Sequence, residues 1–306
     1  MNNNPLSVCI AGLKLGNPTL LASGILGYSP ESLQRIAEAG AGAVVTKSVG
    51  LTPRMGYANP TVVQANCGII NAMGLPNPGI AEYASEISFT KTVIKVPLIV
   101  SVYGYSAEEY AEVAKAAAEA GADAMELNFS CPHVKETGSD IGQNPRLLTQ
   151  VARQVKAVTS KPVIVKLSPN VTDIVELAQA ATKAGADALT AVNTVRAIAI
   201  NAETALPVLS NTRGGLSGPA IKPIALRAVY DIYEQVKAPI FGCGGIATWQ
   251  DAVEFLLAGA SAVQIGTAIA TQDPAVFKTV NRGVTAYLKK KKFRSVKEIV
   301  GQAHRS

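Results

Sequence analysis

Residues 123–133 hold the side chains best suited to chemistry. They read Asp-Ala-Met-Glu-Leu-Asn-Phe-Ser-Cys-Pro-His, so a short apolar run is followed at once by Asn128, Ser130, Cys131 and His133. A thiol just beyond the end of a strand is well placed for proton transfer, since the pKa of a free cysteine is about 8.5. The alternative is a half-buried structural thiol, and the rest of the chain favours the chemical interpretation.

A repeated sequence pattern indicates the elements that position this segment. The motif Ala-Gly-Ala-x-Ala begins at residues 39, 120, 184 and 258, each time after an amphipathic helix and before an apolar strand. Its glycine suits the left-handed residue that ends a helix. Four more aliphatic runs, at 19–23, 98–102, 163–166 and 239–242, raise the number of expected parallel strands to eight.

Eight strands that alternate with helices predict one domain over residues 1–306, a (β/α)8 TIM barrel. A doubly wound open sheet is the alternative, but no glycine fingerprint follows the first strand. Residues 7–16 are expected to form a hairpin that closes the bottom of the barrel. The loops 48–78, after the second strand, and 194–219, after the sixth, are long enough to carry function.

Composition excludes several classes of protein. No apolar run approaches the ~20 residues that cross a bilayer, and the first residues lack a secretory signal, so we expect a cytoplasmic protein. The four cysteines show no CxxC pair and there are only two histidines, so no metal or iron–sulfur site is expected on this chain. The net charge is +6, concentrated near residues 289–294, but aromatic residues make up only 5% and nucleic-acid binding is not expected.

Polar residues gather at the predicted carboxyl ends of the strands, where barrel enzymes have their active sites. One such residue can be a solvated loop start, but two lysines and two asparagines together need partners if they are buried. Glycine-rich turns end the seventh and eighth strands, the usual phosphate position. The residues concerned are Ser23, Lys47, Ser101, Asn128, Lys166, Asn193, Gly244, Gly245, Gly266 and Thr267.

These residues favour a phosphorylated ligand beside two ammonium groups, two amides and a thiol. They include no carboxylate pair and no Ser–His–Asp set, which excludes most hydrolase chemistry. Lysines beside a bound cofactor can stabilise an anion such as a reduced flavin or an enolate. Redox or carbanion chemistry is therefore expected.

Four motifs resemble the class 1 dihydroorotate dehydrogenases, most closely the type B catalytic subunits. They are Asn-Phe-Ser-Cys-Pro at 128–132, Asn-Ala-Met-Gly-Leu-Pro-Asn-Pro-Gly at 71–79, Gly-Gly-Leu-Ser-Gly-Pro-Ala-Ile-Lys-Pro at 214–223 and Gly-Cys-Gly-Gly-Ile at 242–246. The resemblance implies an FMN-containing barrel that oxidises dihydroorotate to orotate in pyrimidine synthesis. It also implies a homodimeric core and a partner subunit that carries FAD and an iron–sulfur cluster and passes electrons to NAD.

The resemblance also implies roles for individual residues. Cys131 would remove the C5 proton while hydride passes from C6 to N5 of FMN. The substrate would be bound by Lys47, Asn71, Ala72, Met73, Gly74, Leu75, Asn128, Asn193 and Thr194. FMN would be bound by Ser23, Lys47, Ser48, Ser101, Asn128, Lys166, Val192, Gly218, Gly244, Gly245, Gly266 and Thr267.

Two positions depart from the family pattern. The family usually has Asn where this chain has Ser101, and Asn where it has His133. Cys-Pro-His resembles the pyrimidine-reducing domain of dihydropyrimidine dehydrogenases, so uracil or thymine reduction is an alternative, and His133 is then either a ligand-facing donor or a lid residue. A fumarate-using type A enzyme and a catalytically idle flavin-binding scaffold also stay open. Cys67 and Cys243 are interpreted as structural.

Overall fold

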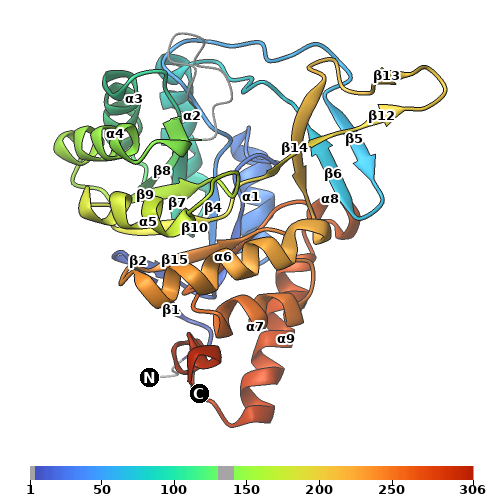
Figure 1. Cartoon of the computed structure of the whole chain (residues 1–306). Coiled ribbons are helices and arrows are strands. Elements are labelled where there is room, and N and C mark those ends of the chain that lie inside the picture. The colour runs from blue at the N-terminus through green and yellow to red at the C-terminus, as the bar shows by residue number, and fades with distance from the viewer. Residues whose placement is uncertain (1–3, 130–140, 306) are drawn as a thin grey trace.

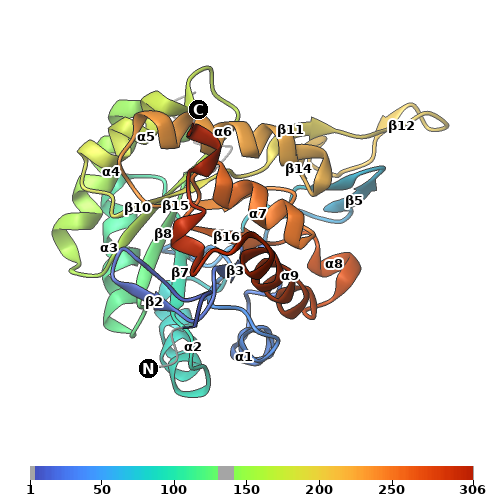
Figure 2. The same cartoon turned by 90° about the horizontal axis from the view of Figure 1, so that it is seen from below.

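Eight parallel strands close into a barrel, in the computed structural model of residues 4–129 and 141–305. Figure 1 shows the barrel from the side, and Figure 2 shows the ring of helices from below. The strands are, in their order round the barrel, β3 (Thr19–Leu21), β4 (Ala43–Val45), β7 (Leu98–Val102), β8 (Ala124–Asn128), β9 (Val163–Leu167), β10 (Ala188–Ala191), β15 (Ile240–Cys243) and β16 (Ala262–Ile265).

Each barrel strand is followed by a helix that covers it, as the alternation in the sequence predicted. The covering helices are α1 (Pro30–Glu38), α2 (Ile80–Val93), α3 (Ala107–Glu119), α4 (Pro145–Val158), α5 (Ile174–Lys183), α6 (Lys222–Gln235), α7 (Trp249–Leu257) and α9 (Val276–Lys291). Short helices are α8 (Ile269–Gln272) and the 3-10 turns η1 (Ile141–Gln143), η2 (Pro219–Ile221), η3 (Val296–Glu298) and η4 (Gln302–His304). The (β/α)8 prediction is therefore confirmed.

Local side-chain hydrogen bonds cap the first turns of several helices. Ser29 and Asn144 cap helices whose first residue is proline, and Thr248 forms a full capping box with Asp251. Ser106 caps α3. The carboxylate of Glu109 accepts a hydrogen bond from the amide of Tyr105, one residue before the cap, rather than from the Ser106 amide as in a capping box. These caps fix where each helix begins after the loop that leaves its strand.

The N-terminal hairpin is present. Strands β1 (Val8–Ile10) and β2 (Leu13–Leu15) pair antiparallel and bury alternate side chains, among them Ile10 and Leu15. The hairpin lies at the bottom of the barrel, near the N-terminus (Figure 1). No helix in the described ranges is long and apolar enough to span a bilayer.

The two long loops combine into one structure, here called the arm (residues 62–71 and 195–217). Its antiparallel sheet has the order β11-β14-β6-β5, from β5 (Val62–Ala65), β6 (Gly68–Asn71), β11 (Val195–Ile198) and β14 (Arg213–Ser217), and the hairpin β12 (Ile200–Asn201) with β13 (Leu206–Pro207) extends from it. Ile70, Ala72 and Leu209 form a small buried cluster of its own. The arm projects beside the barrel (Figure 1), so the long loops are ordered by pairing with each other.

Candidate active site

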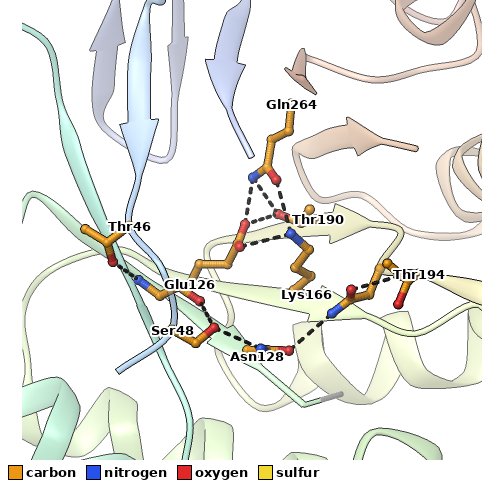
Figure 3. A network of polar contacts seen from close by, with 10 residues as sticks. Thr46, Ser48, Glu126, Asn128, Lys166, Thr190, Thr194 and Gln264 are labelled. Carbon is orange, nitrogen blue, oxygen red and sulfur yellow. Dashed lines mark hydrogen bonds and ion pairs between the residues drawn. The ribbon is translucent and has the colours of Figure 1, made fainter. Parts of the chain in front are cut away.

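A chain of hydrogen bonds joins polar residues from four strands at the carboxyl end of the barrel. Ser101 Oγ lies 2.8 Å from Ser48 Oγ, and Asn128 Nδ2 donates to Ser48 Oγ across 2.9 Å. Asn193 Nδ2 donates to Asn128 Oδ1 at 3.2 Å, and Asn193 Oδ1 accepts from the Thr194 amide at 2.8 Å. These hydrogen bonds bring five predicted residues together, of which Figure 3 labels Ser48, Asn128 and Thr194.

Lys166 lies beside a carboxylate that sequence reasoning missed. Glu126 is 0% exposed, and its Oε1 lies 3.3 Å from Lys166 Nζ. Its Oε2 accepts from Gln264 Nε2 at 2.6 Å and from Thr190 Oγ1 at 2.8 Å (Figure 3). The partner that the burial of Lys166 requires is therefore supplied inside the barrel, by Glu126. Polar residues within otherwise apolar strands, Glu126 in β8 and Gln264 in β16, were the available signal.

Lys47 is the contrasting case. It is 7% exposed, and no described carboxylate lies within ion-pair distance of its Nζ. Its Nζ lies 4.8 Å from the ring centroid of Tyr28, a cation–π contact. Burial lowers the pKa of Lys47 from 10.5 to about 8. An anion bound beside this amine would restore the missing partner, so Lys47 is suited to bind a carboxylate.

Hydrogen bonds from Arg54 and Tyr57, which the sequence did not single out, and from Asn77 of the same motif hold the predicted substrate loop. Arg54 Nε donates to Gly74 O at 2.6 Å, while the amide of Tyr57 donates to Met73 O at 3.1 Å. Asn77 Nδ2 donates to Leu75 O at 2.9 Å and to Tyr103 OH at 2.8 Å. These bonds fix the backbone of residues 71–75 against the barrel rim.

Asn71 connects this loop to the arm. It ends β6, and its Nδ2 donates to Gly215 O of β14 at 3.4 Å. Both loops predicted to carry function therefore meet at the residue that begins the substrate motif. Ala72 is buried and Gly74 and Leu75 have positive φ of 74° and 55°.

The glycine turns after β15 and β16 lie next to the end of the arm. A Cβ placed on Gly245 would lie 2.8 Å from Gly218 O, and one on Gly218 would lie 3.3 Å from Thr267 Cγ2. Gly218, Gly244 and Gly245 have φ of 98°, 133° and 76°, which glycine adopts readily. Thr267 Oγ1 donates to Ser217 Oγ at 2.8 Å. The segments 217–218, 244–245 and 266–267, which are distant in the sequence, therefore lie next to one another.

This cluster fits a phosphate group. Within residues 4–129 and 141–305, the amides of Gly244, Gly245 and Thr267 donate to no protein acceptor. Backbone N–H groups without acceptors, on turns that lack Cβ atoms, are suited to surround an anion. The turn at Gly266 and Thr267 leads directly into the short helix α8, as in other barrels that bind phosphate after their last two strands.

The remaining predicted residues are placed as follows. Ser23 lies two residues beyond β3 and is half-buried, and Val192 is buried beyond β10, where its amide donates to Cys243 O at 2.7 Å. Cys131, Ser130 and His133 lie outside the described residues. Of the cysteines interpreted as structural, Cys243 is partly buried but Cys67 is exposed at the surface. No group of three metal-ligating side chains occurs in the part of the chain that the structure describes.

Comparison with known proteins shows the family of this chain. A family model described as dihydroorotate dehydrogenase matches residues 5–288. A Pyrococcus abyssi protein named dihydroorotate dehydrogenase B (NAD(+)), catalytic subunit, is 54% identical over 298 residues, which cover 97% of this chain and 99% of the relative. Proteins of the same name from Pyrococcus furiosus and Methanosarcina mazei are 53% and 47% identical, each over 300 residues, 98% of this chain and 99% and 95% of the relatives.

Proposed function

This chain belongs to the dihydroorotate dehydrogenase family, oxidoreductases of pyrimidine biosynthesis that use a flavin, and on that basis we propose that it works as a type B catalytic subunit with FMN. One observation carries the proposal: several predicted site residues lie together at the carboxyl end of the barrel. They are Lys47, Lys166, the hydrogen-bonded pair Asn128 and Asn193, and the glycine turns at residues 244–245 and 266–267. The turns provide room for one phosphate, and the lysines provide positive charge for the flavin and for the substrate carboxylate.

The flavin, when bound, supplies the hydride acceptor. Gly244, Gly245 and Thr267 would hold its phosphate through their backbone amides, and Gly218 leaves the space for it. Ser23, Ser48, Ser101, Lys166 and Val192 would line the rest of the flavin. On the substrate side, Lys47 would bind the carboxylate together with the backbone of residues 71–75, while Asn128, Asn193 and Thr194 would orient the pyrimidine ring. Cys131 would take the C5 proton as a general base.

Electrons must then leave the flavin. The sequence contains no GxGxxG dinucleotide fingerprint and no cysteine array for a cluster, so a partner subunit with FAD and an iron–sulfur cluster is proposed to deliver electrons to NAD. The name catalytic subunit, given to the relatives, supports a second subunit. Ile198, Ile200 and Leu206 are exposed on the arm, which supports a homodimeric core. We place the assembly in the cytoplasm.

Two measurements on the purified chain test this function. Orotate should perturb the flavin absorption spectrum at low concentration and uracil should not, because only orotate carries a carboxylate for Lys47. The opposite ranking would favour uracil or thymine reduction. The isolated chain should reduce artificial dyes with dihydroorotate but not NAD, whereas efficient turnover with fumarate would place it with the type A enzymes.

A further inference from the structure

Glu126 is a buried carboxylate to which the proposed mechanism assigns no role. It lies on β8 two residues before Asn128, so both side chains point to the same side of the strand, into the barrel. Asn128 lies at the rim and pairs in register with Lys166 of β9. Glu126 is thus one layer deeper than the proposed flavin site, and Lys166 connects the two layers.

The hydrogen bonds around Glu126 hold it in one orientation. Its Oε2 is bound by Gln264 and Thr190, so Oε1 is directed toward Lys166 Nζ. Gln264 Oε1 also lies 3.4 Å from that ammonium. Lys166 therefore uses two of its N–H groups on Glu126 and Gln264, and the third has no acceptor among the residues that the structure describes.

The charge of Lys166 depends on this carboxylate. A buried ammonium without a partner is unstable and tends to lose its proton. Burial by itself lowers the pKa of Lys166. This effect is outweighed by the attraction to Glu126, by a smaller effect of Cys243 on β15 and by the hydrogen bond to Glu126, so the pKa is raised. Removing the charge of Glu126 leaves burial as the larger effect.

We propose that Glu126 is a positioning residue that keeps Lys166 cationic and directs its remaining N–H toward the flavin, and thereby sets the flavin's reduction potential. The inference rests on the proposed function, because it requires a flavin beside Lys166. A cation at this place stabilises the negative charge that reduction brings to the flavin. A neutral Lys166 would make reduction less favourable.

The variant Glu126→Gln tests this, since its amide keeps the size and one acceptor oxygen of the carboxylate but removes the negative charge. The midpoint potential of bound FMN is measured in the purified holoprotein from pH 6 to 9. We expect the midpoint potential to fall by ~30 mV or more, which for two electrons is a tenfold shift of the equilibrium toward oxidised flavin. Reduction of the variant should also take up one additional proton. An unchanged or raised potential would overturn the inference, because Lys166 would then keep its charge without Glu126.

Two further variants make the result specific. Thr190→Val removes one hydrogen bond to the same carboxylate without changing charge, and should leave the potential at the parent value. Glu126→Asp keeps the charge but shortens the side chain by one methylene, so its potential should lie between those of the parent and Glu126→Gln. If Glu126→Gln does not fold, the Asp variant decides alone: a potential below the parent supports the inference, and an equal or higher one overturns it. Parent protein that binds no FMN would instead refute the proposed function.

Discussion

Asn193 donates a hydrogen bond to Asn128 across 3.2 Å, although β9 separates β8, which ends at Asn128, from β10, which ends two residues before Asn193. The intervening strand β9 carries Lys166, which pairs in register with Asn128. The hydrogen bond holds two amides in fixed orientations at the place where a planar pyrimidine ring is proposed to bind.

Replacing Asn193 by Ala should weaken orotate binding about tenfold. The change removes the amide that is proposed to bind the pyrimidine ring, together with its bonds to Asn128 and the Thr194 amide. One ligand hydrogen bond lost at about 1.4 kcal/mol is a tenfold loss of affinity. The dissociation constant of orotate, from flavin spectral titration, measures the effect, and FMN content should not change. Asn201→Ala on the exposed hairpin of the arm is the matched control. Equal orotate affinity in both variants would remove Asn193 from the substrate site.

Lys47 should make orotate binding depend on pH. Its pKa is lowered to about 8 by burial, so the amine is protonated below that pH and neutral above it. A bound carboxylate favours the protonated form, so affinity should fall as the pH rises through 8, and binding near pH 8 should take up a proton. Calorimetry in two buffers of different ionisation enthalpy measures this uptake. Lys47→Met should abolish it, and uptake that persists in this variant would assign the proton to another group.

The same residue affects stability in a defined direction. The pKa of Lys47 in the folded chain lies below its usual value of 10.5, so the protonated amine destabilises the fold. This cost is fully present below pH 8 and disappears as the pH rises toward 10.5. Replacing Lys47 by Met should therefore increase the free energy of unfolding, relative to the parent, by more at pH 7 than at pH 10. A difference independent of pH would contradict the lowered pKa.

Gly245→Ala should impair FMN binding by tenfold or more. Its Cβ would lie 2.8 Å from Gly218 O, and its φ of 76° is strained for alanine by about 1–2 kcal/mol. Gly16→Ala is the control, because a Cβ there meets nothing within 4 Å. Flavin content after reconstitution and the FMN dissociation constant give the comparison. Normal FMN affinity of Gly245→Ala would place the phosphate elsewhere.

Cys131→Ala should slow reduction of the flavin by dihydroorotate by ~10²–10⁴, the usual contribution of a positioned base. Orotate binding should be retained, because the thiol is proposed to move a proton rather than hold the ligand. In the parent, the rate of reduction should rise with pH toward the pKa of a thiol, ~8.5. Stopped-flow reduction measures both effects, with exposed Cys9→Ala as control. A rate within a few-fold of the parent would assign proton removal to another residue.

The sequence by itself determined the barrel, because the signals that specify it are local. The Ala-Gly-Ala-x-Ala motif ends a helix and starts a strand within a few residues, and caps such as Ser29 and Asn144 need only their neighbours. The family motifs are also contiguous, so Lys47, Asn128 and the glycine turns could be identified before the fold was known.

Only the tertiary structure decided which of these polar and charged residues have a partner inside the protein. Glu126 meets Lys166 40 positions away and Gln264 138 positions away, and the arm pairs Asn71 with Gly215. Such contacts depend on strand register and barrel closure, which no local pattern encodes. For this reason Lys47 and Lys166 look equivalent in the sequence. In the structure, Lys47 is a buried amine with no carboxylate partner among the described residues, and Lys166 is half of a buried ion pair.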